Sequence, residues 1–439
     1  MHSPRQVAHA DLAATHARVT LRLTWIISLS MLVAMMDRNN LALAALKMRP
    51  AIGLTATMLG IGTALFYVAY LVGSIPSNIL LARFGARRWI ARIMISWGFV
   101  CACMAFAWDA HSFYVLRFLL GVAEAGFLPG VFLYLTLWVP QERRGRMNSY
   151  FLMAVPVSGV ITAVVSGLIL RLDGFMGFAG WQLIFLIEAL PAVLLGIVVL
   201  LYLDDRPEDA AWLSPAQKTL LARALAAERA DDGRPEASAG AVIAALVRRP
   251  EVIVLLLGYF GLNVGLSSLI WVPQILETFA LTAFEIALLS ALPAGASVIA
   301  MAIWARRSDI TGERRGHYFA ATLLCAVGFA LAALPASLYG SIIGLMLASG
   351  GAFAAFAVFW TLPPSVLSVR ERPVGIAFIS LFGVVAGMTS PVVIGYLKDA
   401  TGGYAPALFL GALCPLLGGL IIWLGLRRSA AIAVARSAH

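Results

Sequence analysis

Long apolar stretches dominate this chain and constrain its fold more than any other feature. Each stretch is close to the ~20 residues that an α-helix needs to cross a bilayer. The twelve stretches cover residues 22–45, 56–81, 88–107, 112–138, 148–171, 181–203, 250–276, 284–305, 317–335, 338–366, 374–397 and 404–426. Hydrocarbon cannot form hydrogen bonds with backbone N–H and C=O groups, so such stretches must be helical. The sequence therefore predicts an all-α polytopic membrane protein with twelve transmembrane helices.

The composition supports this prediction and excludes a soluble domain with a single anchor. Of the 439 residues, 61% are hydrophobic and only 12% are charged, whereas a soluble protein is about 25% charged. The residues before the first stretch are polar and basic, and no small-residue cleavage site follows them. We therefore expect no secretory signal peptide.

The net charge of +10 is distributed as a membrane topology signal. Most of the 32 Lys and Arg residues fall in the termini and in the even-numbered connections between stretches. The odd-numbered connections hold only Lys47, Arg49, Arg171 and Lys398. By the positive-inside rule, both termini are expected to be cytoplasmic. We expect contact with membrane lipid and no nucleic-acid partner.

One connection, residues 204–249, is much longer than the others and divides the chain. It predicts an N-terminal six-helix bundle over 1–203, a cytoplasmic linker over 204–249 and a C-terminal six-helix bundle over 250–439. Within the linker, Ser214 is expected to cap a surface helix, with Gln217 reaching back to the start of that helix.

The two halves share landmarks at a nearly constant offset, which indicates a duplicated unit. These are the GARR and GERR motifs that begin at Gly85 and Gly312, the Gly-aromatic pairs at Gly180 and Gly403, and the prolines Pro191 and Pro415. Internal repeats of this kind are typical of secondary transporters. We therefore expect two pseudo-symmetric six-helix bundles.

Four charged residues lie inside predicted spans, namely Asp37, Arg38, Arg117 and Glu124. Each would cost roughly 2.5–3.5 kcal/mol at the centre of a spanning helix unless it faces a partner or a cavity. Arg117 and Glu124 are seven residues apart and share one helix face. Asp37 and Arg117 are expected at similar depth, so Asp37 could pair with Arg117.

The residue types suit the binding of a carboxylate and of a proton. An arginine presents a permanent charge and a planar fork that can hold a carboxylate with two hydrogen bonds. A buried carboxyl group can gain or lose a proton as its surroundings change. The four charges could also serve only to brace the bundle, but their concentration in one half exceeds what bracing requires.

The second half has no charge deep in any span and offers neutral groups instead. Candidate substrate contacts are Asn263, Trp360, Thr361 and Ser380, with Tyr70 from the first half. For Tyr70, Asn263 and Trp360, a structural role is equally compatible with the sequence. Glu188, a fifth acid within a span, is interpreted as structural.

Other function classes lack the residues that they require. All six histidines lie in the termini or at span edges, and no His/Cys ligand spacing occurs. We therefore expect no enzyme, no metal site and no cofactor. No G-x-x-x-x-G-K-[ST] loop occurs, so ATP is not the expected energy source. A receptor on a transporter scaffold would need an appended signalling domain.

Several segments carry a specific resemblance. The chain resembles the major facilitator superfamily, and within it the anion:cation symporter family of the tartrate, galactonate, hydroxyphenylacetate and phthalate type. The similar segments are RFGARR, RRSDITGERR, RFLLGVAEAGFLPGVFLYLTLW, GWQLIFLIEALPAVLLG, LDDRPEDAAWLS and VIGYLKDATG. In the run GIAFISLFGVVAG, Ser380 and Val384 replace asparagines that are frequent in sugar-acid transporters. This departure weakens a sugar-acid assignment.

The resemblance implies roles for the four charges. Arg38 would bind the substrate carboxylate, Asp37 and Glu124 would carry protons, and Arg117 would be their counter-ion. It implies proton-coupled uptake of a small organic anion by alternating access, in the inner membrane of a bacterium. An anion exchanger or uniporter on the same fold is the alternative. We expect a monomer.

Overall fold

The computed structural model describes residues 4–139, 141–231, 239–334, 337–368 and 370–437, and all regular structure in these ranges is helical. Twelve of its helical segments are long and apolar enough to cross a membrane. They follow the twelve apolar stretches of the sequence to within a few residues at most edges. The predicted all-α polytopic fold is confirmed, and the chain is a multi-pass membrane protein.

The first group of helices comes from the N-terminal half of the chain. It comprises α1 (Pro4–Ile52), α2 (Ala56–Phe84), α3 (Ala86–Cys103), η1 (Met104–Phe106), α4 (Ala110–Glu124), α5 (Phe127–Trp138), α6 (Gln141–Leu170), η2 (Phe175–Gly177) and α7 (Gly180–Tyr202). Within this group, α3 packs on α7, α2 packs on α4, and α1 packs on both α6 and α7.

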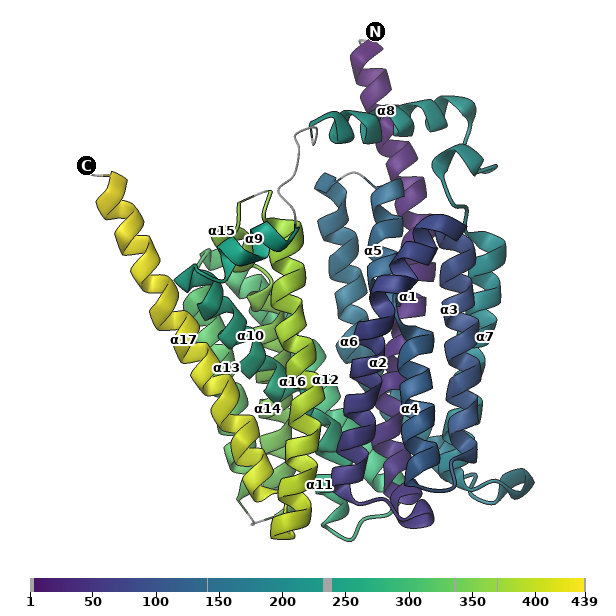
Figure 1. Ribbon diagram of the computed structural model, residues 1–439, viewed down its shortest axis with the longest axis vertical. Helices are drawn as coiled ribbons and strands as arrows, with labels where there is room; N and C mark the ends of the chain where they lie inside the picture. The colour runs from purple at the N-terminus through teal and green to yellow at the C-terminus, as the bar shows by residue number, and fades with distance from the viewer. Residues whose placement is uncertain (1–3, 140, 232–238, 335–336, 369, 438–439) are drawn as a thin grey trace.

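The second group comes from the C-terminal half and lies beside the first (Figure 1). It comprises α10 (Pro250–Ser268), η4 (Leu269–Trp271), α11 (Val272–Glu277), α12 (Ala283–Thr311), α13 (Arg315–Ala333), α14 (Leu338–Phe359), α15 (Pro363–Val366), α16 (Arg372–Thr401) and α17 (Ala405–Ser437). Here α14 packs on α12 and α13, while α17 packs on α10 and α13.

The linker between the two groups carries η3 (Pro207–Asp209), α8 (Pro215–Asp231) and α9 (Ala239–Leu246). Helices α8 and α9 lie at the end of the molecule that carries both chain termini (Figure 1). The predicted start of α8 is confirmed, because the Gln217 backbone N–H donates to the Ser214 hydroxyl and the Ser214 N–H donates to the Gln217 side chain. The exact domain boundaries at 203 and 249 remain predictions.

Several spans of the described structure join more than one helical segment, which the apolar pattern alone does not indicate. Helix α4 ends at Glu124, and α5 begins at Phe127 after a turn in which Gly126 has φ of 87°. The span that begins with α10 passes through η4 into α11, and the α14 span passes into α15. The first break places Glu124 at the end of a helix inside the span.

The two groups meet most closely at the end remote from the chain termini, which we call the distal end. There, α2 packs on α16 and α6 packs on α12. The Asp399 carboxylate accepts hydrogen bonds from the backbone N–H groups of Ala56 and Thr57 and from the Thr57 hydroxyl. A Cβ atom on Gly60 would lie 2.3 Å from the carbonyl oxygen of Pro391. These contacts join the two helix groups at the distal end.

Candidate functional site

An ion pair inside the first helix group joins α1 to the end of α4. Arg38 Nε donates a 2.7 Å hydrogen bond to Glu124 Oε1, and Arg38 Nη2 lies 2.5 Å from the same oxygen. The Glu124 side chain is 3% exposed, whereas that of Arg38 is 20% exposed. Glu124 is therefore buried, whereas Arg38 is partly accessible from the space between the helix groups.

Aromatic rings from α2 surround the cation of this pair. The Arg38 guanidinium carbon lies 4.9 Å from the centroid of the Tyr70 ring and 5.4 Å from that of Phe66. The faces of such rings attract cations, and more strongly where water is excluded. Tyr70, a predicted substrate contact, thus packs against the guanidinium of Arg38.

Arg117 occupies a separate place on α4, also against α2. Its Nε donates to the backbone oxygen of Gly62 at 3.3 Å, and its guanidinium carbon lies 4.8 Å from the Phe66 ring centroid. Gly121, one turn further along α4, permits this close packing, since a Cβ atom there would lie 2.3 Å from the Phe66 carbonyl oxygen. Phe66 therefore lies against both guanidinium groups.

The suggested pair between Asp37 and Arg117 is absent from the structure, where these two described residues form no ion pair. Asp37 instead accepts a 2.6 Å hydrogen bond from Trp97 Nε1 and lies 3.8 Å from the Cys101 sulfur, both on α3. Successive helical residues point about 100° apart. Asp37 therefore faces α3 while Arg38 faces α2 and α4.

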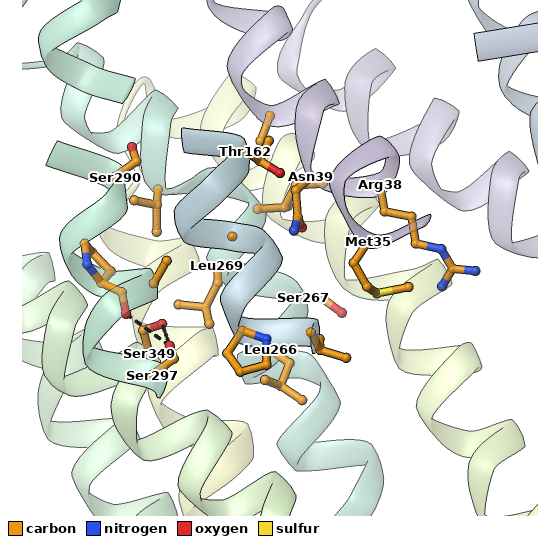
Figure 2. Close-up of a pocket in the computed structure, with 18 of the residues that line it drawn as sticks. Met35, Arg38, Asn39, Thr162, Leu266, Ser267, Leu269, Ser290, Ser297 and Ser349 are labelled. Carbon is orange, nitrogen blue, oxygen red and sulfur yellow. Dashed lines mark hydrogen bonds between the residues drawn. The ribbon is translucent and has the colours of Figure 1, made fainter. Parts of the chain in front are cut away.

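A cavity of about 320 Å³ lies between the two helix groups, within the usual size of small-molecule sites, roughly 300–1,000 Å³. Its lining combines polar side chains from α1 and α6 with others from α10, α12 and α14 (Figure 2). The polar lining residues are Arg38, Asn39, Thr63, Tyr67, Thr162, Asn263, Ser267, Ser290, Ser297 and Ser349.

The remaining cavity wall is apolar, with Leu43, Leu266, Ile270 and Phe356 among its members. Arg38 is the one charged side chain among the described residues that line it. Figure 2 shows Arg38 on one side of the cavity and the hydrogen-bonded hydroxyls of Ser297 and Ser349 on the other. The cavity thus offers one cationic end and a neutral remainder.

Not all of the predicted substrate contacts line this cavity. Asn263 does line it, and the Asn263 amide donates to the Tyr259 carbonyl oxygen. The hydroxyls of Thr361 and Ser380 donate to carbonyl oxygens of their own helical turns. Trp360 packs edge-on against Tyr259. Within the described structure, four predicted contacts lie outside the cavity lining, and their binding roles remain predictions: Tyr70, Trp360, Thr361 and Ser380.

Several polar lining residues were not predicted from the sequence, among them Asn39 and Thr162. Asn39 directly follows the charged pair, and its Nδ2 donates to Ser158 Oγ at 3.1 Å. Thr162 is 1% exposed, and its hydroxyl has no hydrogen-bond partner. Asn39 could have been found, since it is an amide beside two charges at membrane depth. Thr162 gives no such signal in an otherwise apolar stretch.

Metal chemistry has no support in the described residues, where no group of three or more His, Cys, Asp or Glu side chains converges.

Comparison with known proteins agrees with the architecture of the site. The profile described as Major Facilitator Superfamily matches residues 27–273. A protein of Agrobacterium vitis named as a proposed tartrate transporter is 44% identical, covering 90% of this chain and 90% of the relative. The inner membrane transport protein RhmT of Escherichia coli K12 is 34% identical, covering 89% of this chain and 90% of that protein.

Solved structures show the same fold at low identity. A bacterial homolog of the human lysosomal transporter Spinster, in an inward-facing and unoccupied conformation, superposes with a TM-score of 0.74 at 17% identity. That match covers 94% of this chain and 97% of the other. The xylose transporter XylE from E. coli gives a TM-score of 0.73 at 14% identity, covering 92% and 97% of the two chains. The chain therefore belongs to the Major Facilitator Superfamily and is a membrane transporter, not an enzyme.

Proposed function

We propose that this transporter is a proton-coupled symporter that takes up a small organic anion bearing a carboxylate. The observation that carries the proposal is the ion pair between Arg38 and Glu124 at the edge of the cavity. An arginine that already holds a carboxylate can hold a substrate carboxylate in the same geometry. Glu124 and the substrate would then compete for one guanidinium.

This competition gives a physical basis for coupling. Protonation of Glu124 removes its charge and frees Arg38 to bind the anion, so the site gains one proton and one negative charge together. For a monocarboxylate, the loaded site has the same net charge as the empty, ion-paired site, whereas a dicarboxylate such as tartrate would need one further proton for the same balance. A net charge is unfavourable at the low dielectric of the protein interior, so binding of the anion without the proton, or of the proton without the anion, would be unfavourable. The proton and the anion would then be released together on the other side.

The lining indicates what the rest of the substrate is like. Beyond Arg38 the cavity offers the amides of Asn39 and Asn263 and the free hydroxyl of Thr162. These groups can exchange hydrogen bonds with hydroxyls on a substrate. A hydroxy acid such as tartrate fits this pattern, and the relatives named as proposed tartrate transporters support it.

Alternating access is the transport mode that the closed distal end supports. By the distribution of basic residues we assign the termini to the cytoplasm, which makes the distal end periplasmic. The contacts of Asp399 with Ala56 and Thr57 then close the outer entrance. We propose a monomer in the inner membrane of a bacterium, driven by the proton gradient and without a cofactor.

Uptake by purified protein in liposomes tests the proposal. Labelled tartrate is added outside, with an acidic exterior and a neutral interior. The expected result is accumulation above the equilibrium level, abolished by a protonophore. Tartrate that equilibrates without accumulating would indicate a uniporter, and uptake that requires internal anion would indicate an exchanger. Either result would overturn the proposed coupling.

A further inference from the structure

Glu188 on α7 is a buried acid that the proposed function does not use. It is 3% exposed. Ser166 on α6 donates a 2.5 Å hydrogen bond to Glu188 Oε1, whereas Glu188 Oε2 has no hydrogen-bond partner. A carboxylate that is buried with one oxygen unsatisfied is costly, since both oxygens need donors when they carry charge. The geometry suits a neutral, protonated acid better.

Glu188 and Asp37 belong to one polar cluster that crosses α1. Asn40 lies one turn beyond Asp37 on α1, and its amide lies beside the Glu188 carboxyl. The Asn40 amide also lies 3.9 Å from the Cys101 sulfur, which in turn lies 3.8 Å from Asp37 Oδ1. The two carboxyl groups are close enough to interact electrostatically.

Among the described residues, no cation forms an ion pair with either acid. Arg38 pairs with Glu124, and Arg117 contacts the Gly62 carbonyl and the Phe66 ring. The helices packed against α7 supply no further charge toward Glu188. Helix α1 contributes Asp37, and α3 contributes the Cys101 thiol. Neither η1 nor residues 153–170 of α6 contain a titratable side chain.

Two neighbouring acids without a cation cannot both be ionised at low dielectric, because each charge disfavours the other. We propose that Asp37 and Glu188 form a two-acid site that holds one proton, which makes Glu188 a further proton-binding residue of this transporter. Its part in the transport cycle rests on the proposed function. Protons bound by such a pair belong to the pair rather than to either residue.

The hydrogen bonds indicate where the proton resides in this state. Asp37 accepts from the Trp97 N–H and lies beside the Cys101 thiol, and such donors stabilise a charged carboxylate. Glu188 accepts from the Ser166 hydroxyl and has the Asn40 amide beside it, but no described donor makes a hydrogen bond to its Oε2. The proton therefore resides on Glu188 while Asp37 is ionised, and both acids lie on the α3 and α7 side of α1, away from the Arg38 guanidinium.

Infrared difference spectroscopy of the purified full-length protein tests the site without any substrate. Lowering and raising the pH should reveal the carbonyl stretch of a protonated, buried carboxyl. Because Glu124 also takes up a proton in this experiment, Glu188→Gln should remove one component of the band and leave the Glu124 component, whereas the matched control Glu277→Gln, which removes an exposed acid at the end of α11, should retain both. An unchanged carboxyl band in Glu188→Gln would overturn the inference.

Liposome uptake gives the second readout. Glu188→Gln should move the midpoint of pH-dependent uptake by about one pH unit or more, equivalent to a tenfold change in proton affinity, and Glu277→Gln should leave it unchanged. A wild-type profile in Glu188→Gln would show that Glu188 is only a structural brace. If the wild-type protein carries no anion at all, the proposed function fails while the infrared result still decides the inference.

A second variant covers the case in which Glu188→Gln does not fold. Ser166→Ala keeps both acids and removes only the 2.5 Å hydrogen bond to Glu188. The carbonyl stretch of the protonated carboxyl should then shift to the frequency of a weaker hydrogen bond. An unshifted band would contradict the assignment of the proton to Glu188.

Discussion

Glu124 Oε1 accepts a 2.7 Å hydrogen bond from Arg38 Nε, which joins two helices whose contributing residues are 86 positions apart in the chain. The pair lies where α4 ends and beside a cavity that contains no other charged lining residue in the described structure. The proposed coupling follows from this relationship, because the acid that neutralises the arginine must release it before an anion can bind.

The first prediction concerns the shape of the cation. Arg38→Lys retains the charge but loses the planar fork that can hold a carboxylate with two hydrogen bonds. The dissociation constant for tartrate should rise about tenfold, equivalent to ~1.4 kcal/mol. Isothermal titration with the purified protein measures this change. The control Arg83→Lys alters an exposed arginine at the end of α2 and should bind as the wild type does. Equal affinity of Arg38→Lys and wild type would contradict the role of the fork.

The second prediction concerns the neutral end of the substrate. Asn263→Leu removes an amide from the cavity lining and retains the approximate volume of the side chain. Loss of one hydrogen bond should weaken tartrate binding about fivefold to tenfold, or ~1–1.5 kcal/mol. Succinate, which lacks the two hydroxyls, should be affected less. The measurement is the ratio of the affinities for tartrate and succinate in the wild type and in Asn263→Leu. An equal loss of affinity for both acids would show that Asn263 does not bind the hydroxyls of the substrate.

The third prediction concerns the closed distal end. Asp399→Ala removes the acceptor for the first N–H groups of α2. A lost helix cap costs ~1 kcal/mol, so the closed population should fall about fivefold relative to the open one. Distances between spin labels on α2 and α16 would report this shift.

The matched control for that experiment is Asp173→Ala. Asp173 accepts a hydrogen bond from the Gly180 N–H within the first helix group. Its loss removes a comparable cap that does not bridge the two groups, so the label distances should not change. An identical distribution in Asp399→Ala and wild type would show that this cap does not hold the distal end closed.

The fourth prediction is a pH dependence of stability. Hydrogen bonds from the backbone N–H and hydroxyl of Ser368, assisted by the Arg249 guanidinium, hold the pKa of Glu371 below its usual value. In the unfolded chain the pKa of a glutamate is about 4.3. Because the pKa of Glu371 is lower in the folded state, ionised Glu371 stabilises the fold at pH values above the unfolded-state pKa. This stabilisation disappears as the pH falls through the folded-state pKa.

Glu371→Gln should therefore be less stable than the wild type at neutral pH, by less than about 1 kcal/mol because solvent screens this partly exposed pair. The difference should shrink as the pH falls below about 4. Thermal unfolding across this pH range measures it, with Glu208→Gln as an exposed control. A difference that is the same at all pH values would contradict the electrostatic origin.

The twelve spans were predictable because each is set by local composition, and a long apolar segment in lipid has only the helix available. The breaks inside spans were only partly predictable: the glycines of GVAEAGFLPG and the pair Pro363-Pro364 indicate points where a helix can bend, but not the backbone angles there. At Gly126, which has φ of 87°, the turn packs against α2, since a Cβ atom would lie 2.2 Å from Ser77 Oγ. This turn decides where the Glu124 side chain lies.

The sequence identified the four buried charges but not how they pair. Depth in the membrane follows from position along a helix, so Asp37 and Arg117 looked well matched. Their rotation about the helix axes directs Asp37 to Trp97 instead. The sequence favoured a structural role for Glu188, and it could not reveal the hydrogen bond of Glu188 to Ser166 or its proximity to Asp37.

The central claim is that Glu124 and the substrate compete for Arg38, and the pH dependence of anion affinity tests it most directly. Binding of tartrate to the purified protein is titrated at several pH values for the wild type and for Glu124→Gln. The wild type should bind more tightly as the pH falls, because protonation of Glu124 frees Arg38. Glu124→Gln should bind tightly with little dependence on pH. The same pH dependence in Glu124→Gln as in the wild type would contradict the account.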